Sequence, residues 1–185
     1  MDKNLNDLVH NVIWPAVAGN VLWSFLQVVA DPNITGPTLW PRLASLLLIG
    51  VYLSIDWVIT HNKRDHINEK YGRFDMFLAA SIATFAIATQ FGTWWAPFAL
   101  AMVFGVAVVG NWLGAWDLRD RASSCKARRA FTGINALGLI GLGLLILMDP
   151  NEWYALWLTP VAILVVVVLY LCLREKITTR WPNTA

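Results

Sequence analysis

Charged residues are scarce in this 185-residue chain, where Asp, Glu, Lys and Arg together make up 14%. An ordinary soluble domain carries about 25% charged and about 45–50% apolar residues, whereas 57% of this chain is apolar. This composition excludes a disordered chain, and the net charge of +2 excludes a strongly basic nucleic-acid-binding domain. Cysteine is also scarce, with Cys125 and Cys172 as the only two. Their spacing fits neither a zinc site nor a disulfide framework.

Long apolar runs are what the sequence does contain. A helix needs about 20 mostly apolar residues to cross about 30 Å of hydrocarbon. Six stretches qualify, at approximately 11–30, 40–59, 74–91, 95–116, 130–148 and 153–173. The runs are continuous rather than alternating, which excludes the strands of a membrane barrel. The sequence therefore predicts an all-α polytopic membrane protein with six transmembrane helices, in which residues 1–185 form a single transmembrane domain.

The distribution of Lys and Arg predicts the orientation of these helices. Four basic residues lie in the connection 60–73 and five in the connection 117–129, whereas the other side of the membrane has only Arg42. This asymmetry predicts an N-in/C-in bundle of three helical hairpins, with both termini cytoplasmic. The expected location is a plasma membrane such as the bacterial inner membrane.

Little of the chain is left outside the predicted spans. The connections on the outer side are short, and the two longest inner ones have about 14 residues each. A soluble catalytic or nucleotide-binding domain does not fit in them. The function is therefore expected inside the bundle, on its basic face, or in contact with another chain.

Polar residues within a span are the default place to look for function, because burying them in lipid is costly. We expect five residues to line a pathway: Asn20, Trp23, Asp56, Asn111 and Asn135. The alternative for the asparagines is a purely structural hydrogen bond between helices, worth about 0.6–2 kcal/mol. For Asp56 the alternative is solvation at the headgroups, and for Trp23 it is anchoring at the membrane boundary.

Three further predictions concern the packing of the helices and the outer surface of the bundle. Gly110 and Gly114 form a GxxxG step, which favours close packing of helices in lipid. Span 153–173 has few polar residues and is expected to face lipid or a neighbouring subunit. Four arginines in the second inner connection are expected to contact lipid headgroups or a partner: Arg119, Arg121, Arg128 and Arg129.

Motifs for catalysis and cofactor binding are missing from the sequence. It contains neither a Gly-x-Ser-x-Gly elbow nor a His-Glu-x-x-His zinc pair. No arrangement of residues in the sequence therefore indicates an enzyme. We expect no metal and no cofactor. The leading hypothesis is a channel or transporter component for a small solute or ion, and the alternative is a non-catalytic integral subunit of a larger membrane complex. The expected partners are the lipid bilayer and further copies of the chain or other membrane subunits, with no nucleic acid.

Overall fold

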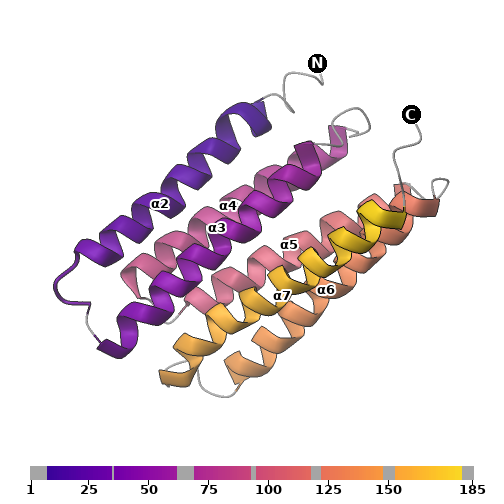
Figure 1. Ribbon diagram of the computed structural model, residues 1–185. Coiled ribbons are helices and arrows are strands. Elements are labelled where there is room, and N and C mark those ends of the chain that lie inside the picture. Colours follow the sequence, from indigo (N-terminus) through magenta and orange to yellow (C-terminus); the bar gives the residue numbers. More distant parts are fainter. Residues whose placement is uncertain are drawn as a thin grey trace.

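The computed structural model describes residues 8–34, 36–61, 69–92, 95–117, 122–147 and 153–180. Over these residues it contains six α-helices, and the prediction of an all-helical chain is confirmed (Figure 1). The helices are α2 (Trp14–Ala30), α3 (Leu39–His61), α4 (Glu69–Phe91), α5 (Ala96–Asp117), α6 (Ala122–Leu147) and α7 (Trp153–Arg180). A π-helical turn, η1 (Val9–Ile13), precedes α2, and a 3-10 turn, η2 (Gly36–Thr38), precedes α3.

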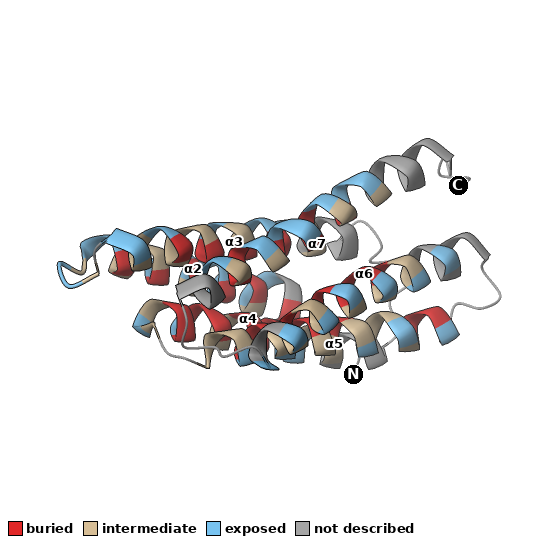
Figure 2. Ribbon diagram, turned by 90° about the horizontal axis from the view of Figure 1, so that it is seen from below, coloured by how far each residue is buried: buried red, intermediate tan, exposed pale blue. Residues whose placement is uncertain are grey.

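The helices form two layers of three (Figures 1 and 2). One layer contains α2, α3 and α7, with α3 packed between its two neighbours, and the other contains α4, α5 and α6, with α5 in the middle. The layers meet along two edges, where α2 packs against α4 and α6 packs against α7. Each helix runs antiparallel to the next one in the chain, so α2, α4 and α6 begin at the same end of the bundle. We call this end the basic end, because α3 and α5 end there and continue in the sequence into the segments rich in Lys and Arg.

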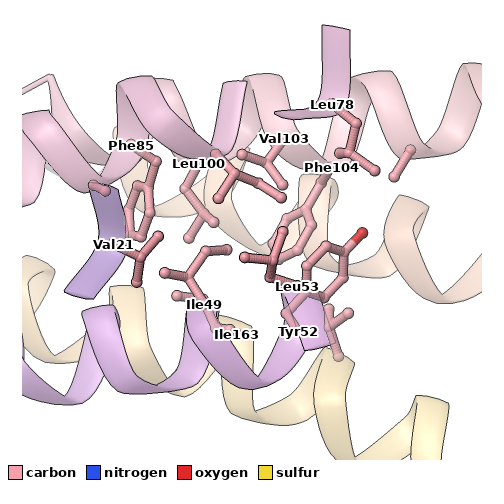
Figure 3. Close-up of a cluster of buried hydrophobic side chains, with 14 of the residues drawn as sticks. Val21, Ile49, Tyr52, Leu53, Leu78, Phe85, Leu100, Val103, Phe104 and Ile163 are labelled. Carbon is pink, nitrogen blue, oxygen red and sulfur yellow. The ribbon is translucent and has the colours of Figure 1, made fainter. Parts of the chain in front are cut away.

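Apolar side chains fill the space between the layers. Ile49 from α3, Phe85 from α4 and Phe104 from α5 are fully buried and point toward one another (Figure 3). Leu100 and Ile163 are also fully buried in this cluster. Close packing of this kind is typical of protein interiors. The middle of the bundle is therefore a packed core.

The outer faces of the helices are apolar as well. Large exposed side chains include Leu22, Leu47, Phe77, Met102, Ile140 and Leu164. Among the described residues, four segments are long and apolar enough to cross a membrane: Asn11–Ala30, Gly36–Asp56, Phe74–Phe91 and Ala96–Trp116. A shorter apolar helical segment covers Trp157–Leu173. A bundle that is apolar both inside and outside indicates an integral membrane protein.

Two glycines mark close contacts between helices. A Cβ on Gly138 of α6 would lie 2.9 Å from both Phe104 of α5 and Val166 of α7, so the three helices approach closely there. A Cβ on Gly110 would lie 3.5 Å from the Cβ of Phe74, which puts this glycine at the contact between α5 and α4. Gly114, one turn further along α5, is buried.

Helix α7 has two different faces, so the prediction that its span faces lipid or a neighbouring subunit can apply to one of them only. Val161, Leu164 and Val168 are exposed, but Ile163 and Tyr170 are buried in the core. The sequence does not reveal the two faces, because both carry branched apolar residues. A helical periodicity becomes apparent only where one face carries polar residues.

Candidate functional site

Side chains with charge or strong polarity come together inside the bundle near its basic end. Asp56 lies five residues before the end of α3 at His61, and Asp75 lies six residues after the start of α4 at Glu69. Arg128 lies six residues after the start of α6 at Ala122. At about 1.5 Å per residue, all three are roughly 8–9 Å from the helix ends. We call Asp56, Asp75 and Arg128 the charged cluster.

The guanidinium of Arg128 is held in place by an amide from the neighbouring helix. Its Nη1 donates a hydrogen bond to Oδ1 of Asn111 at 3.2 Å, and Nδ2 of Asn111 donates to the backbone oxygen of Ala107 at 2.9 Å. Because the second bond fixes the amide, its oxygen points toward the guanidinium. Arg128 is half-buried, whereas the adjacent Arg129 is exposed.

Two aspartates lie within electrostatic range of this guanidinium. Asp56 and Asp75 both interact electrostatically with Arg128, and Asp75 also interacts with Asp56. Both aspartates are half-buried. Oδ2 of Asp75 is buried and has no hydrogen-bond partner among the described residues. Within the charged cluster itself, two acidic side chains accompany one basic side chain, and this composition suits a positively charged ligand.

A second polar group lies next to the charged cluster, deeper in the bundle. Tyr52 Oη donates to Oδ1 of Asn135 at 3.2 Å, and Nδ2 of Asn135 donates to Tyr170 Oη at 2.6 Å. All three residues are at most 2% exposed. We call them the buried triad, and it links α3, α6 and α7.

Aromatic packing holds the buried triad rigid. The rings of Tyr52 and Tyr170 meet edge to face at 5.7 Å, and Phe131 stacks on Tyr170 at 4.6 Å. Nδ2 of Asn135 also donates to the backbone oxygen of Phe131 at 2.9 Å, which fixes the orientation of the amide. Tyr170 interacts electrostatically with Asp56 and Arg128, so the buried triad lies near the charged cluster, and we call the two together the polar region.

The structure brings together part of the pathway that the sequence predicts. Asp56, Asn111 and Asn135 belong to this polar region. Asn20 lies on α2, half-buried, and its Oδ1 is buried without a hydrogen-bond partner among the described residues. Trp23 lies on the outer face of α2 and is 59% exposed, so the structure does not bring it to the other four.

The arginines that the sequence assigns to lipid headgroups or a partner take different places. Arg128 belongs to helix α6 and contacts Asn111 inside the bundle, whereas Arg129 is exposed. The reason is that α6 begins at Ala122, so the end of the predicted inner connection is helical. Arg119 and Arg121 lie outside the described residues.

Sequence reasoning missed Asp75, Tyr52 and Tyr170. Asp75 has a signal, because it stands directly after the first residue of the span 74–91 at a depth similar to that of Asp56. Tyr52 also has one, because it lies one helical turn before Asp56 and therefore on the same face. Tyr170 sits in the most apolar span, and nothing near it in the sequence indicates a polar partner.

A different polar group ties the helices together at the opposite end. Arg42 Nη1 donates to the backbone oxygen of Gln90 at 3.4 Å, and Ser24 Oγ donates to Gln90 Oε1 at 3.2 Å. The guanidinium of Arg42 also covers Gly92, which has a φ of 62° and where a Cβ would overlap it. A cation at this position suits the carbonyl groups at the end of α4.

No family model, no curated protein and no solved structure matches this chain. Within the part of the chain that the structure describes, there is also no group of three or more His, Cys, Asp or Glu side chains that could hold a metal ion. The polar region near the basic end is the candidate site on the strength of its own side chains.

Proposed function

We propose that this chain is a membrane transporter component that moves a small cation such as a proton or a sodium ion across a bilayer. The observation that supports the proposal is the electrostatic interaction of Asp56, Asp75 and Arg128, which come from three separate helices and lie within the bundle near one end. Ionisable groups inside a membrane protein are costly and mark ion or substrate pathways. Two carboxylates beside one guanidinium favour a positively charged ligand.

A transporter fits the interior better than an open channel does. Fully buried apolar side chains such as Ile49, Phe85 and Phe104 fill the middle of the bundle beyond the polar region. An open channel needs a continuous polar lining. A site on one side of a closed apolar core is instead what a transporter has when it is open to that side.

The proposal includes the topology that the Lys and Arg distribution predicts. All six helices cross the membrane, both termini are cytoplasmic, and the basic end faces the cytoplasm of a bacterial-type inner membrane. Asp56, Asn111 and Asn135 then belong to a site entered from the cytoplasm. We further propose that the chain assembles as a homo-oligomer.

Flux into liposomes that contain the purified protein tests this function. We propose to impose a proton gradient or a sodium gradient and to follow it with an entrapped pH-sensitive or sodium-sensitive dye. The wild-type chain is expected to dissipate at least one of the gradients faster than protein-free liposomes do. Wild-type rates equal to those of protein-free liposomes for both ions would overturn the proposal.

Variants of the charged cluster connect the flux to the site. Asp75→Asn and Arg128→Gln are expected to lower the rate by about tenfold or more, since a hydrogen bond or contact to a charged group is worth about 1.5–3 kcal/mol. Arg129→Gln is the matched control, because Arg129 is the next residue on α6 and is exposed. Equal losses in Arg128→Gln and Arg129→Gln would place the site elsewhere.

The filled apolar core also supports a second candidate function, a non-catalytic integral subunit of a larger membrane complex. Such a subunit needs no pathway, and its outer apolar faces would bind other chains. Native mass spectrometry of the protein extracted gently from its own membrane distinguishes the two. Foreign chains at fixed stoichiometry would support the subunit, and a homo-oligomer without them would support the transporter.

A further inference from the structure

Arg128 is a permanent positive charge in the charged cluster. An arginine side chain stays protonated in proteins, so its charge does not change as ions bind and leave. Its Nη1 donates to Oδ1 of Asn111 at 3.2 Å, and Nδ2 of Asn111 donates to the backbone oxygen of Ala107 at 2.9 Å. The guanidinium is therefore tied to α5 while it interacts electrostatically with Asp56 of α3 and Asp75 of α4.

The two aspartates by themselves would suit a divalent cation. Carboxylate oxygens are the ligands that calcium prefers, and calcium accepts them in flexible arrangements. Oδ2 of Asp75 is buried and accepts no hydrogen bond within the described part of the chain, so the protein leaves its lone pairs unused. A site that moves protons or sodium ions therefore needs a group that keeps calcium away from Asp56 and Asp75.

A fixed positive charge affects divalent cations more strongly than monovalent ones. The interaction energy of two charges is proportional to their product, so Arg128 repels a divalent cation with twice the free energy with which it repels a monovalent cation at the same place. Twice the free energy is the square of the factor in affinity. Arg128 therefore lowers the affinity for calcium far more than the affinity for sodium.

We propose that Arg128, held in place by Asn111, restricts the site to monovalent cations by keeping divalent cations from the two aspartates. This inference rests on the proposed function, because the charged cluster has to be the cation site. It adds the class of ion that the site rejects and the residue that determines this specificity.

Equilibrium binding of radioactive sodium and radioactive calcium to the full chain in neutral detergent tests the inference. Binding is measured at about pH 8.5, well above the usual titration range of aspartate, so that protons compete little. Arg128→Gln is expected to raise the affinity for sodium about tenfold and the affinity for calcium about a hundredfold, the square of the first factor. A cation that binds more tightly also leaves more slowly, which agrees with the lower flux expected of this variant.

Two further arginine variants separate charge from structure. Arg128→Lys keeps the positive charge but loses the planar guanidinium, and its affinity for calcium is expected to stay within about threefold of the wild type. A merely structural role of Arg128 would affect the Lys and Gln variants alike. Arg129→Gln is the matched control, because Arg129 is the next residue on α6 and is exposed, and it is expected to change neither affinity.

A variant of Asn111 keeps the inference testable if Arg128→Gln does not fold. Asn111→Asp retains Arg128 but places a carboxylate at its guanidinium, so it is expected to raise the affinity for calcium more than the affinity for sodium. Unchanged affinity for calcium in the folded variants, or equal gains for both ions, would overturn this inference. Wild-type flux in liposomes together with that result would leave the proposed function standing, whereas a wild type without flux would overturn both.

Discussion

Two arginines at the two ends of the bundle have different surroundings. Near the basic end Arg128 interacts with two aspartates inside the bundle, whereas at the other end Arg42 donates to a backbone carbonyl at the end of α4. Arg42 completes a helix end and also interacts with Asp31, so its charge has a structural use. Arg128 interacts with two acidic side chains from other helices, Asp56 and Asp75. Capping of a helix end does not account for this arrangement, so we expect Arg42 to serve stability alone and Arg128 to serve both stability and the proposed transport.

Removing Arg128 should have the largest effect on stability. Arg128→Leu leaves Asp56 and Asp75 without their shared cation, and we expect the free energy of unfolding to fall by about 2–3 kcal/mol, between the values for exposed and fully buried ion pairs. Reversible unfolding in mixed detergent and SDS micelles measures this. Arg129→Leu should change the free energy by less than about 0.5 kcal/mol, and an equal loss would contradict the difference between the two arginines.

Breaking the buried triad should have the next largest effect. Asn135→Leu removes the acceptor of Tyr52 and the donor to Tyr170, and leaving buried polar groups without a partner costs about 1–3 kcal/mol. We expect a loss of about 2 kcal/mol in the same unfolding assay. Tyr52→Phe removes a single hydroxyl and should cost about 1 kcal/mol. If both variants unfold like the wild type, the triad does not hold α3, α6 and α7 together.

At the opposite end, Gly92 offers a test of the Arg42 cap. Gly92→Ala is expected to cost about 1–2 kcal/mol, because its φ of 62° is unfavourable for other residues and a Cβ displaces the guanidinium of Arg42. Gly36→Ala is the control, since Gly36 has a φ of 55° and open space around it. The excess cost at Gly92 over Gly36 measures the contribution of Arg42. An equal cost would show that the cap adds nothing to stability.

The smallest effect is expected for the hydrogen bond between α2 and α4. Ser24→Ala removes the donor to Gln90, and bonds of this kind between membrane helices average about 0.6 kcal/mol. A double-mutant cycle with Gln90→Leu isolates this contribution from the change in packing. A coupling energy above about 1.5 kcal/mol would contradict this order, because the bond between Ser24 and Gln90 would then stabilise the bundle about as much as the interactions near the basic end.

Hydropathy predicted the positions of the helices well, because each apolar run needs a helix to satisfy its backbone in lipid. It did not predict where α4 and α6 begin, at Glu69 and Ala122 rather than near 74 and 130. A helix can continue through charged residues beyond its apolar part, and hydropathy does not predict that extension. For this reason Arg128 seemed to belong to a connection.

The candidate site was only partly visible in the sequence. Three of its residues stand out as polar residues within apolar runs: Asp56, Asn111 and Asn135. The free-energy cost of placing a polar residue in lipid depends on the residue and its position in the run, so the sequence is enough to identify them. Their pairing with Asp75 and Tyr170 depends on how α3, α4, α6 and α7 pack together, which no local pattern determines. The outward direction of Trp23 has the same cause, because α2 has apolar residues on both of its faces.

The measurement that tests this account most directly is a pair of double-mutant cycles on unfolding free energy. Asp75→Asn is combined with Arg128→Gln in one cycle and with Arg129→Gln in the other, so that two adjacent arginines of α6 are compared. We predict a coupling energy of about 1 kcal/mol or more for Arg128 and none for Arg129. No coupling in either cycle would contradict it, because Asp75 and Arg128 would then not meet inside the bundle.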